Sequence, residues 1–393
     1  MLDALQAQPA DALLALIKLH AADPRDDKID LGVGVYRTGD GATPVFKAIK
    51  GAEQRLVDEQ DSKSYLGPEG DGGFVSGLMP YIFGGNPERG GRIAGMQTPG
   101  GTGAVRLALA LAQKAGARRV HLGTPSWPNH AQIVSDLGLE TVPFDHALPD
   151  GTANLDAVLR VIREGGEGEL VLLHGCCHNP TGANLTQAQW GQVVAHLQKT
   201  GAVPLIDIAY QGFGDGLSQD AAATRLIAAG LPEVLIAASC SKNFGIYRER
   251  AGLLMTIVEN STSQPVTQST LNFLNRQNYS FPPDHGARLV TMILNDAALR
   301  DDWQSELEDT RLAMLELREQ LAAELRQRTN SDRFDFIARH RGMFSRIGAT
   351  PAQVEAMRLD YGIYMVGDSR LNIAGLNAKT VPILAEAIVA SGV

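Results

Sequence analysis

The 393-residue chain contains only three cysteines, and two of them, Cys176 and Cys177, are adjacent. This spacing gives neither a disulfide framework nor the paired CxxC motifs of a metal site. We therefore expect the cysteines to be small buried residues in a reduced, cytoplasmic protein that holds no metal.

Long apolar runs and dense basic stretches are also missing. No segment approaches the roughly 18 apolar residues of a membrane span, and the first twenty or so residues lack the basic start of a signal peptide. The formal net charge of -9 argues against nucleic acid or an anionic membrane as a partner. What remains, with 44% hydrophobic residues, is the composition of an ordinary soluble globular protein.

Short apolar runs alternate with helix-like segments between about residues 95 and 255. Each run is followed by Gly, Pro, Ser or Asn, as expected of central strands covered on both faces. The runs are RRVHLGTP, ELVLLHGC, AVPLIDIAY, EVLIAASCS and AGLLMTIV, and the helix-like segments include 103–115, 130–137 and 186–199. The alternation predicts an α/β fold with a doubly wound, mostly parallel sheet, whose ligands gather at the C-terminal ends of the strands.

The two ends of the chain predict a second, smaller α+β domain. Residues 13–19 have the apolar spacing of a short amphipathic helix. A long charged helix is expected over residues 297–328, followed by the strand-like segments FDFIA, GMFSRIG, YGIYMV and LNIAGL and a last helix from Thr380. We expect residues 1–43 and 310–393 to form the small domain and residues 44–309 to form the large one.

Charged side chains follow two of the predicted strands. The run from Val234 to Ala238 leads directly into SCSK, which ends at Lys242. This lysine is either a surface residue of the next loop or a buried amine, and burial favours the neutral form of an amine. Asp207 ends another apolar run, where it either caps a neighbouring helix or faces a cation or several donors.

Other strand ends carry a glycine-rich turn (GGTG, 100–103), Trp127, Asn179 and Tyr210. The turn opens into a helix and suits a phosphate, although a plain tight turn has the same composition. It lacks the lysine of a Walker motif and the full GxGxxG of a dinucleotide site. An amine, an acid, a stacking ring and phosphate donors are together the groups that pyridoxal 5′-phosphate needs. We therefore predict that the large domain binds this cofactor, with Lys242 as the amine of the Schiff base.

The chain resembles the class I aminotransferases, in particular the subgroup for aspartate and aromatic amino acids. The matching stretches are HGCCHNPTG, DIAYQGFG, SCSKNFG, NYSFPPDHG and SRLNIAGL, and the resemblance covers essentially the entire chain. It implies the type I pyridoxal-phosphate-dependent transferase fold and a homodimer with shared active sites. It also implies a ping-pong transfer of an amino group to 2-oxoglutarate.

The resemblance gives most of the cofactor-binding residues a role. Lys242 would carry the proton removed from the substrate, and Asp207 would keep the pyridine nitrogen protonated. His130 and His174 resemble histidines that lie behind this carboxylate, with ordinary packing as the alternative. The other implied ligands are Gly101, Thr102, Trp127, Asn179, Tyr210, Ser239 and Arg250, together with Tyr65 from the neighbouring subunit.

Two arginines match the substrate-binding arginines of the family, and the alternative for each is an exposed surface residue. Arg370 would bind the α-carboxylate as a bidentate pair. Arg276 would reach across the dimer to a distal carboxylate. Gly34 matches a place where the backbone approaches the substrate, and the remaining implied substrate contacts are Trp127, Asn179, Phe281 and Phe344.

Phe281 stands where aspartate-specific relatives usually carry Asn, and an apolar ring there favours aromatic substrates. Val35, Thr43 and Thr102 look like the aspartate type, so the sequence predicts dual specificity with an aromatic preference. A strictly aspartate-specific aminotransferase is the alternative. More remote alternatives are a pyridoxal-phosphate enzyme that does not transaminate and an effector-binding domain. The incomplete GxGxxG motif argues against a nicotinamide dehydrogenase.

Overall fold

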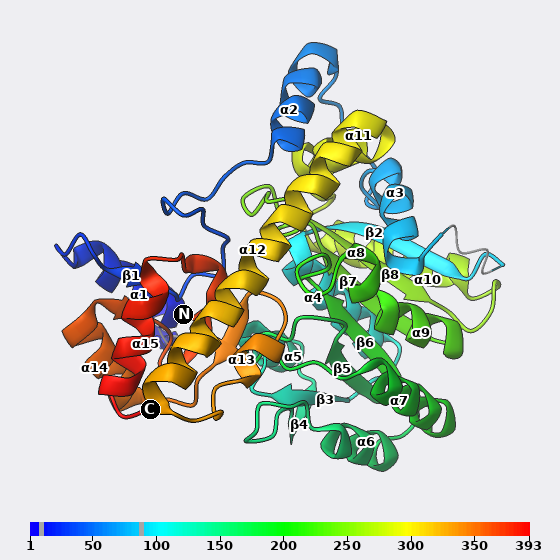
Figure 1. Ribbon diagram of the computed structural model, residues 1–393. Helices are drawn as coiled ribbons and strands as arrows, with labels where there is room; N and C mark the ends of the chain where they lie inside the picture. Colours follow the sequence, from blue (N-terminus) through cyan, green and yellow to red (C-terminus); the bar gives the residue numbers. More distant parts are fainter. Residues whose placement is uncertain (8–11, 86–89) are drawn as a thin grey trace. The chain divides into compact units, whose positions relative to one another are not determined.

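The computed structural model describes residues 1–7, 12–85 and 90–393 (Figure 1). The chain divides into two compact units, one formed by Met1–Thr43 with Met314–Val393 and the other by Pro44–Ala313. The helix α12 (Ala297–Thr329) contributes residues to both units. No helix within the described ranges is long and apolar enough to cross a membrane.

The larger unit contains a seven-stranded sheet in the order β2-β8-β7-β6-β5-β3-β4. Neighbouring strands from β7 to β4 run parallel, whereas β8 is antiparallel to both β7 and β2. The mostly parallel sheet predicted from the sequence is therefore confirmed. The strands are β2 (Ile93–Pro99), β3 (Arg119–Thr124), β4 (Glu140–Asp145), β5 (Leu170–His174), β6 (Val203–Ile208), β7 (Val234–Ser239) and β8 (Ala251–Ile257).

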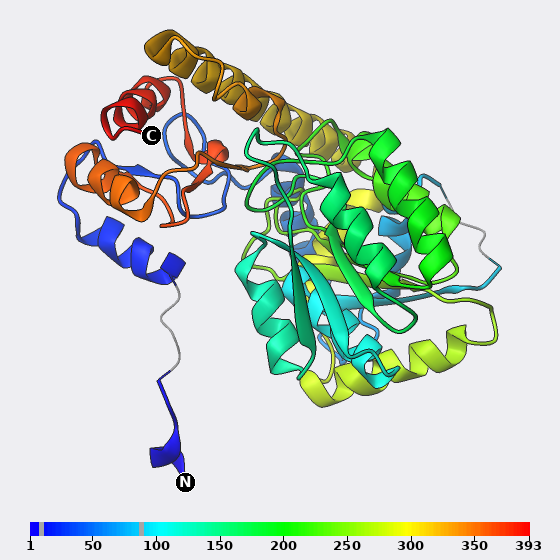
Figure 2. The ribbon, with the colours of Figure 1, turned by 90° about the horizontal axis from the view of Figure 1, so that it is seen from below.

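Helices cover both faces of this sheet (Figure 2), which explains why β7 and β8 are buried at every residue. On one face α4 packs against β7 and β8, and α10 packs against α4. The helices are α2 (Lys47–Glu59), α3 (Gly72–Phe83), α4 (Gly100–Lys114), α5 (Pro128–Asp136), α6 (Leu155–Glu164), α7 (Gln187–Thr200), α8 (Leu217–Asp220), α9 (Ala222–Gly230), α10 (Gln264–Asn278) and α11 (Asp284–Asn295).

Local sequence signals set the starts of several helices. Thr186 and Gln189 form a capping box at the start of α7, so each side chain satisfies a backbone N–H of the other residue. Pro128 occupies the first position of α5, where its missing N–H costs nothing. As a result Trp127 is fixed at the junction between the β3 loop and α5.

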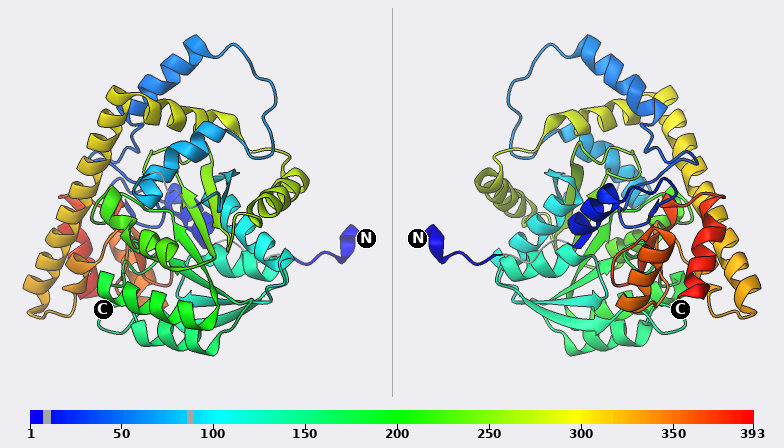
Figure 3. Two further views of the ribbon diagram at one scale, coloured as in Figure 1. Left: turned by 90° about the vertical axis from the view of Figure 1, so that its right-hand side faces the viewer. Right: turned by 90° about the vertical axis from the view of Figure 1, so that its left-hand side faces the viewer.

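The smaller unit is built from both ends of the chain. Strand β1 (Ile29–Asp30) pairs in parallel with β10 (Ile363–Tyr364), and β9 (Phe344–Arg346) pairs antiparallel with β11 (Arg370–Asn372). Helices α14 (Pro351–Tyr361) and α15 (Thr380–Ala390) lie side by side and contribute to one apolar core (Figure 3). The unit also contains α1 (Ala12–Ala22), α13 (Phe336–Arg339) and the 3-10 turns Leu2–Ala4 and Ile373–Gly375.

Two expectations about local structure were wrong. The segment FDFIA is not a strand, because it leads into α13, and its residues Phe334 and Ile337 are buried at the three-residue spacing of a helix. Helix α1 forms as predicted, but it buries Leu16 and leaves Ile17 and Leu19 41% and 47% exposed. Ile17 and Leu19 of its predicted apolar face are therefore partly exposed rather than buried.

Candidate active site

A cavity of about 80 Å³ lies in the larger unit at the edge where its parallel strands end. Strand β5 ends at His174, β6 carries Asp207 one residue before its end, and β7 ends at Ser239. Ligands of doubly wound sheets bind at this edge. The cavity is lined by Gly101, Thr102, Trp127, His174, Asn179, Asp207, Ala209, Tyr210, Ser239, Ser241, Lys242 and Arg250.

Arg250 reaches this edge because β8 runs antiparallel to β7. Strand β8 therefore begins where β7 ends, and the loop between them carries Lys242. Arg250 has a positive φ of 55°, and its Nη1 donates hydrogen bonds to Ser241 Oγ and Tyr247 O, both at 3.0 Å. These bonds fix the guanidinium at the wall of the cavity.

Lys242 contributes its side-chain amine to the cavity, with Nζ 4.7 Å from the ring centroid of Tyr210. Burial lowers the pKa of Lys242 to about 8, although the nearby Asp207 carboxylate opposes this shift and Arg250 adds to it. A large fraction of the amine is therefore neutral at mildly alkaline pH, which is the form that attacks a carbonyl group.

Asp207 is ionised in spite of its burial. Burial alone would raise its pKa, but the hydrogen bond from His130 and the electrostatic interactions with His130, His174 and Lys242 bring the pKa below its ordinary value. His130 Nε2 lies 3.0 Å from Asp207 Oδ2, and His130 Nδ1 lies 2.9 Å from Ser126 Oγ. We infer that Nε2–H donates to the carboxylate and that the serine hydroxyl donates to Nδ1. The carboxylate is thus prepared to hold a protonated ring nitrogen.

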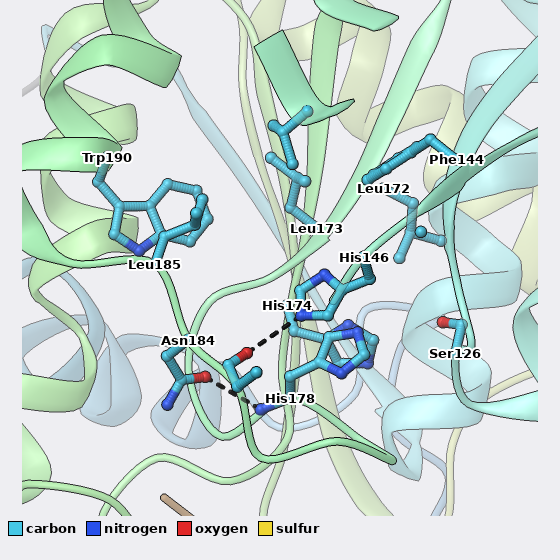
Figure 4. A pocket seen from close by; sticks show the side chains of 13 residues that line it. Ser126, Phe144, His146, Leu172, Leu173, His174, His178, Asn184, Leu185 and Trp190 are labelled. Atoms are coloured by element: carbon cyan, nitrogen blue, oxygen red, sulfur yellow. Dashed lines mark hydrogen bonds between the residues drawn. The ribbon is translucent and has the colours of Figure 1, made fainter. Parts of the chain in front are cut away.

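Three further histidines, His174, His178 and His146, lie next to one another beside Asp207. His174 pairs with Asp207 in the parallel register of β5 and β6, and its ring lies 4.3 Å from that of His178. His178 in turn stacks on His146 with ring centroids 3.4 Å apart. These rings line a separate cavity of about 20 Å³ (Figure 4). Burial lowers the pKa of His174 to about 3 and that of His146 to about 4, so both are neutral near pH 7.

The start of α4 forms a cradle for an anion. Gly100 has a φ of 68°, and a Cβ at this position would lie 2.2 Å from Arg250 Nη2. A Cβ at Gly101 would lie 3.1 Å from that of Ser239. Because these two residues have no side chain, the first backbone N–H groups of α4 can lie close to the Arg250 guanidinium and the Ser239 hydroxyl. These N–H groups lack partners within the helix. Such a set of donors suits a phosphate group.

Two buried polar atoms of cavity-lining residues, Asn179 Oδ1 and His174 Nε2, have no hydrogen-bond partner within the described ranges. Asn179 makes one long bond, from Nδ2 to Tyr210 OH at 3.5 Å. Because buried polar atoms are normally paired, these atoms indicate room for a polar ligand. The amine, the carboxylate and the anion cradle fit the aldehyde, the ring nitrogen and the phosphate of pyridoxal phosphate.

Three of the predicted substrate residues lie together in the smaller unit. Arg370 is buried, its Nη2 donates to Gly32 O at 2.7 Å, and its guanidinium lies 4.6 Å from the ring centroid of Phe344. A Cβ at Gly34 would lie 2.8 Å from Cζ of the same ring, so only glycine permits this approach. Phe344 therefore contacts both of the other predicted residues.

Tyr65, Arg276 and Phe281 belong to the larger unit, but none of them is among the described residues that line its cavity. Tyr65 is 85% exposed, and its ring packs on that of Phe281 with centroids 4.9 Å apart. Arg276 lies exposed in the last turn of α10 and hydrogen-bonds Ser280 Oγ. Within one chain, Tyr65 and Phe281 therefore pack on each other away from the cavity, and Arg276 is exposed.

Sequence reasoning missed several residues of the site. Ser241 lines the cavity and binds Arg250, and the motif SCSK contained this signal, although a role was predicted only for Ser239. His146 and His178 were also missed. His178 lies inside the quoted motif HGCCHNPTG, whereas His146 lies just after the edge strand β4 with no motif around it.

Comparisons with known proteins agree with this geometry. Residues 26–388 match the model of the family "Aminotransferase class I and II". The chain is 52% identical to the aromatic-amino-acid aminotransferase of Paracoccus denitrificans, with all of both chains covered. It is 40% identical to the aspartate aminotransferase of Escherichia coli K12, with 99% of this chain and 100% of the relative covered.

A solved structure gives the same result. The aromatic-amino-acid aminotransferase of Burkholderia pseudomallei, covalently bound to pyridoxal phosphate, superposes with a TM-score of 0.96 at 35% identity, covering 100% of this chain and 99% of the other. The fold is that of the type I pyridoxal-phosphate-dependent transferases, and the cofactor is pyridoxal phosphate. The chain belongs to the class I and II aminotransferases.

Proposed function

We propose that this aminotransferase moves the amino group of aromatic amino acids and of aspartate to 2-oxoglutarate, with a preference for aromatic substrates. The observation that carries the proposal is the Lys242 amine, whose pKa burial lowers to about 8, in a cavity that also holds the ionised Asp207. The substrate range is supported by the similarity to an aromatic-amino-acid aminotransferase at 52% identity and to an aspartate aminotransferase at 40%.

Pyridoxal phosphate, when bound, supplies an aldehyde that exchanges with amino groups and a ring that withdraws electrons from the substrate. Lys242 would hold the cofactor through its amine and, once the substrate's amine has taken that place, would accept the proton from the substrate's Cα. Asp207 would accept a hydrogen bond from the ring nitrogen, and His130 holds the carboxylate in place for it. Asn179 and Tyr210 would donate hydrogen bonds to the phenolic oxygen, and Trp127 would cover the ring.

The start of α4 would bind the phosphate together with Ser239 and Arg250. Gly101 and Thr102 would contribute backbone N–H groups, and the guanidinium of Arg250 would donate in its planar fork. Tyr65 would add its hydroxyl from the neighbouring subunit. This contribution is supported by the exposure of Tyr65 in its own chain, which leaves the phenol accessible to a partner.

Substrate carboxylates are bound by two arginines. Arg370 takes the α-carboxylate, with the Phe344 ring against its guanidinium, and Gly34, whose missing Cβ leaves room for that ring, lies close to the bound substrate. Arg276 of the partner subunit takes the distal carboxylate of aspartate and of 2-oxoglutarate. Phe281 presents an apolar ring near this end, which favours aromatic side chains. The enzyme is therefore a homodimer with shared active sites, and we place it in the cytoplasm, where its three buried cysteines stay reduced.

The test is a comparison of kcat/KM for phenylalanine, tyrosine and aspartate, each with 2-oxoglutarate. We expect all three to react, the aromatic pair faster, with one glutamate formed for each oxo acid consumed. Activity with aspartate alone would favour a strictly aspartate-specific enzyme. Turnover without any need for an oxo acid would mean that the cofactor serves another reaction. Sedimentation of the purified protein tests the dimer, and cell fractionation tests its location.

A further inference from the structure

Arg318 is a cation in the interior of the smaller unit. It lies on α12, and its side chain is 0% exposed, although arginine is almost never fully buried without partners. We infer that Arg318 is a positioning residue for substrate binding, because it holds the segment that supports Arg370. The inference rests on the proposed role of Arg370 in binding the α-carboxylate.

The guanidinium of Arg318 donates four hydrogen bonds into residues 337–345. Nη1 donates to Ile337 O at 3.1 Å and to Ser345 Oγ at 2.8 Å. Nη2 donates to Gly342 O and Phe344 O, both at 2.7 Å. All four acceptors thus lie within nine residues of sequence, and one planar group ties α13 to the start of β9.

A histidine extends this set of bonds. Ser345 Oγ accepts a bond from Arg318 and lies within hydrogen-bond distance, 3.1 Å, of His340 Nδ1. Both Ser345 and His340 are buried. Because these groups have little access to water, losing one partner is costly, and the segment keeps one conformation.

Phe344 connects this anchor to the substrate residues. Its carbonyl oxygen is held by Arg318, while its ring lies 4.6 Å from the Arg370 guanidinium and fills the space beside Gly34. In the register of β9 and β11, Phe344 also pairs with Asn372, two residues from Arg370. A shift of the Phe344 backbone therefore changes both the surface beneath Arg370 and the strand that carries it.

A lysine at position 318 keeps the charge but has a single nitrogen, which cannot reach four acceptors in one plane. In Arg318→Lys holoenzyme we expect the dissociation constants of 3-phenylpropionate and succinate to rise about tenfold, the effect of one lost hydrogen bond to a charged group. These non-reactive acids share only the carboxylate that Arg370 binds. KM should rise for both substrate types, while kcat and the affinity for pyridoxal phosphate change less than about twofold.

The matched control is Arg326→Lys on the same helix. Arg326 donates to Asp335 Oδ2 at 2.6 Å, but its side chain is 58% exposed, so its replacement should leave both dissociation constants unchanged. Ser345→Ala removes one of the four acceptors. It should raise both dissociation constants about threefold, less than the change expected for Arg318→Lys. This variant decides the question if Arg318→Lys does not fold.

Arg370→Ala separates the inference from the function on which it rests. If Arg370→Ala binds both acids normally, the proposed carboxylate site is wrong. If Arg370→Ala loses binding but Arg318→Lys and Ser345→Ala bind both acids with wild-type affinity and only melt earlier, Arg318 is a structural residue and the inference is overturned.

Discussion

The amine of Lys242 lies over the face of the Tyr210 ring, with Nζ 4.7 Å from the ring centroid. An aromatic face attracts a cation, and the Asp207 carboxylate does the same, so both favour the ammonium form. Burial outweighs them and lowers the pKa of Lys242 to about 8. The amine is therefore more reactive at a given pH than an exposed lysine.

This relationship predicts the pH dependence of cofactor attachment. The neutral amine is the nucleophile, so the rate at which the cofactor-free protein attaches pyridoxal phosphate should rise about tenfold per pH unit below pH 8 and level off above it. With a lysine of ordinary pKa, the rate of attachment would keep rising up to about pH 10. Stopped-flow absorbance measures the rate. Borohydride should fix the cofactor to the peptide that contains Lys242, and labelling of another lysine would contradict the assignment.

Replacement of Asp207 by Asn should remove the charge that holds the ring nitrogen protonated. Breaking such a buried pair costs about 3–5 kcal/mol, so kcat/KM should fall by at least about a hundredfold. The cofactor should remain bound through the phosphate cradle at Gly101 and Arg250. Steady-state kinetics with a parallel measurement of bound cofactor make the check, and near-normal turnover would rule out the role of Asp207.

Replacement of Phe281 by Asn should shift specificity toward aspartate. The amide restores a polar partner near the distal carboxylate, and a hydrogen bond to a charged group is worth about 1.5–3 kcal/mol. The ratio of kcat/KM for aspartate over phenylalanine should therefore rise about tenfold or more. Phe273→Asn is the control, because Phe273 is also on the surface of the larger unit, where Lys114 lies 5.3 Å from its ring centroid. An equal shift in both variants would exclude a specific effect of Phe281.

Mixing two inactive variants tests the shared active site. If Arg276 acts across the dimer and Lys242 within its own chain, a heterodimer of Lys242→Ala and Arg276→Asp contains one intact site and one doubly defective site. After random subunit exchange, aspartate activity should return to about a quarter of the wild-type value. Exchange demonstrated by mass labels without recovered activity would place Arg276 in its own chain's site.

His146 should make the protein sensitive to acid. Its pKa in the folded protein is lowered to about 4, whereas a histidine in the unfolded chain titrates near 6.5. Its contribution to the free energy of unfolding is therefore fully present above about pH 6.5 and is lost as the pH falls toward 4. The contribution is at most about 1.4 kcal/mol per pH unit. His146→Phe keeps a ring beside His178 but cannot be protonated.

Urea unfolding at several pH values between 7 and 4.5 measures this effect. The variant loses the hydrogen bond from His146 Nε2 to Ala183 O, which lowers stability at every pH. The informative quantity is therefore the slope of the free energy of unfolding against pH. The titration of His174 changes this slope in the same direction as that of His146, and the titration of Asp220 changes it in the opposite direction, since burial raises the pKa of Asp220 to about 6. These two groups remain in the variant, so the difference between the slopes belongs to His146. Identical slopes would show that folding does not lower the pKa of His146.

The strands that the sequence predicted best are those buried on both faces. The runs that became β5, β6 and β7 are apolar nearly throughout, so their pattern alone separated them from loops. Strand β4 lies at the edge of the sheet and has only one buried residue, Phe144, which leaves no such run. Strand β2 contains Gly95 and Gln97, a glycine and a polar residue that interrupt its apolar run.

Most of the cavity residues were predictable because parallel strands bring their C-terminal ends to one edge, so residues far apart in sequence meet there. The burial of Arg318 was not predictable. It stands in a helix with many charged residues, and nothing in its local pattern distinguishes it from exposed neighbours such as Glu319. Only the fold shows that the oxygens of residues 337–345 surround its guanidinium.

The antiparallel direction of β8 has a consequence for protein engineering. Lys242 and Arg250 belong to a single hairpin, so a peptide inserted between β7 and β8 would change the spacing between the amine and the phosphate anchor. The loops at the opposite edge of the sheet turn at Gly116, Gly168 and Gly201, and none of the three is among the described residues that line the cavity. An affinity tag or a fluorescent reporter grafted at these turns leaves the catalytic edge untouched.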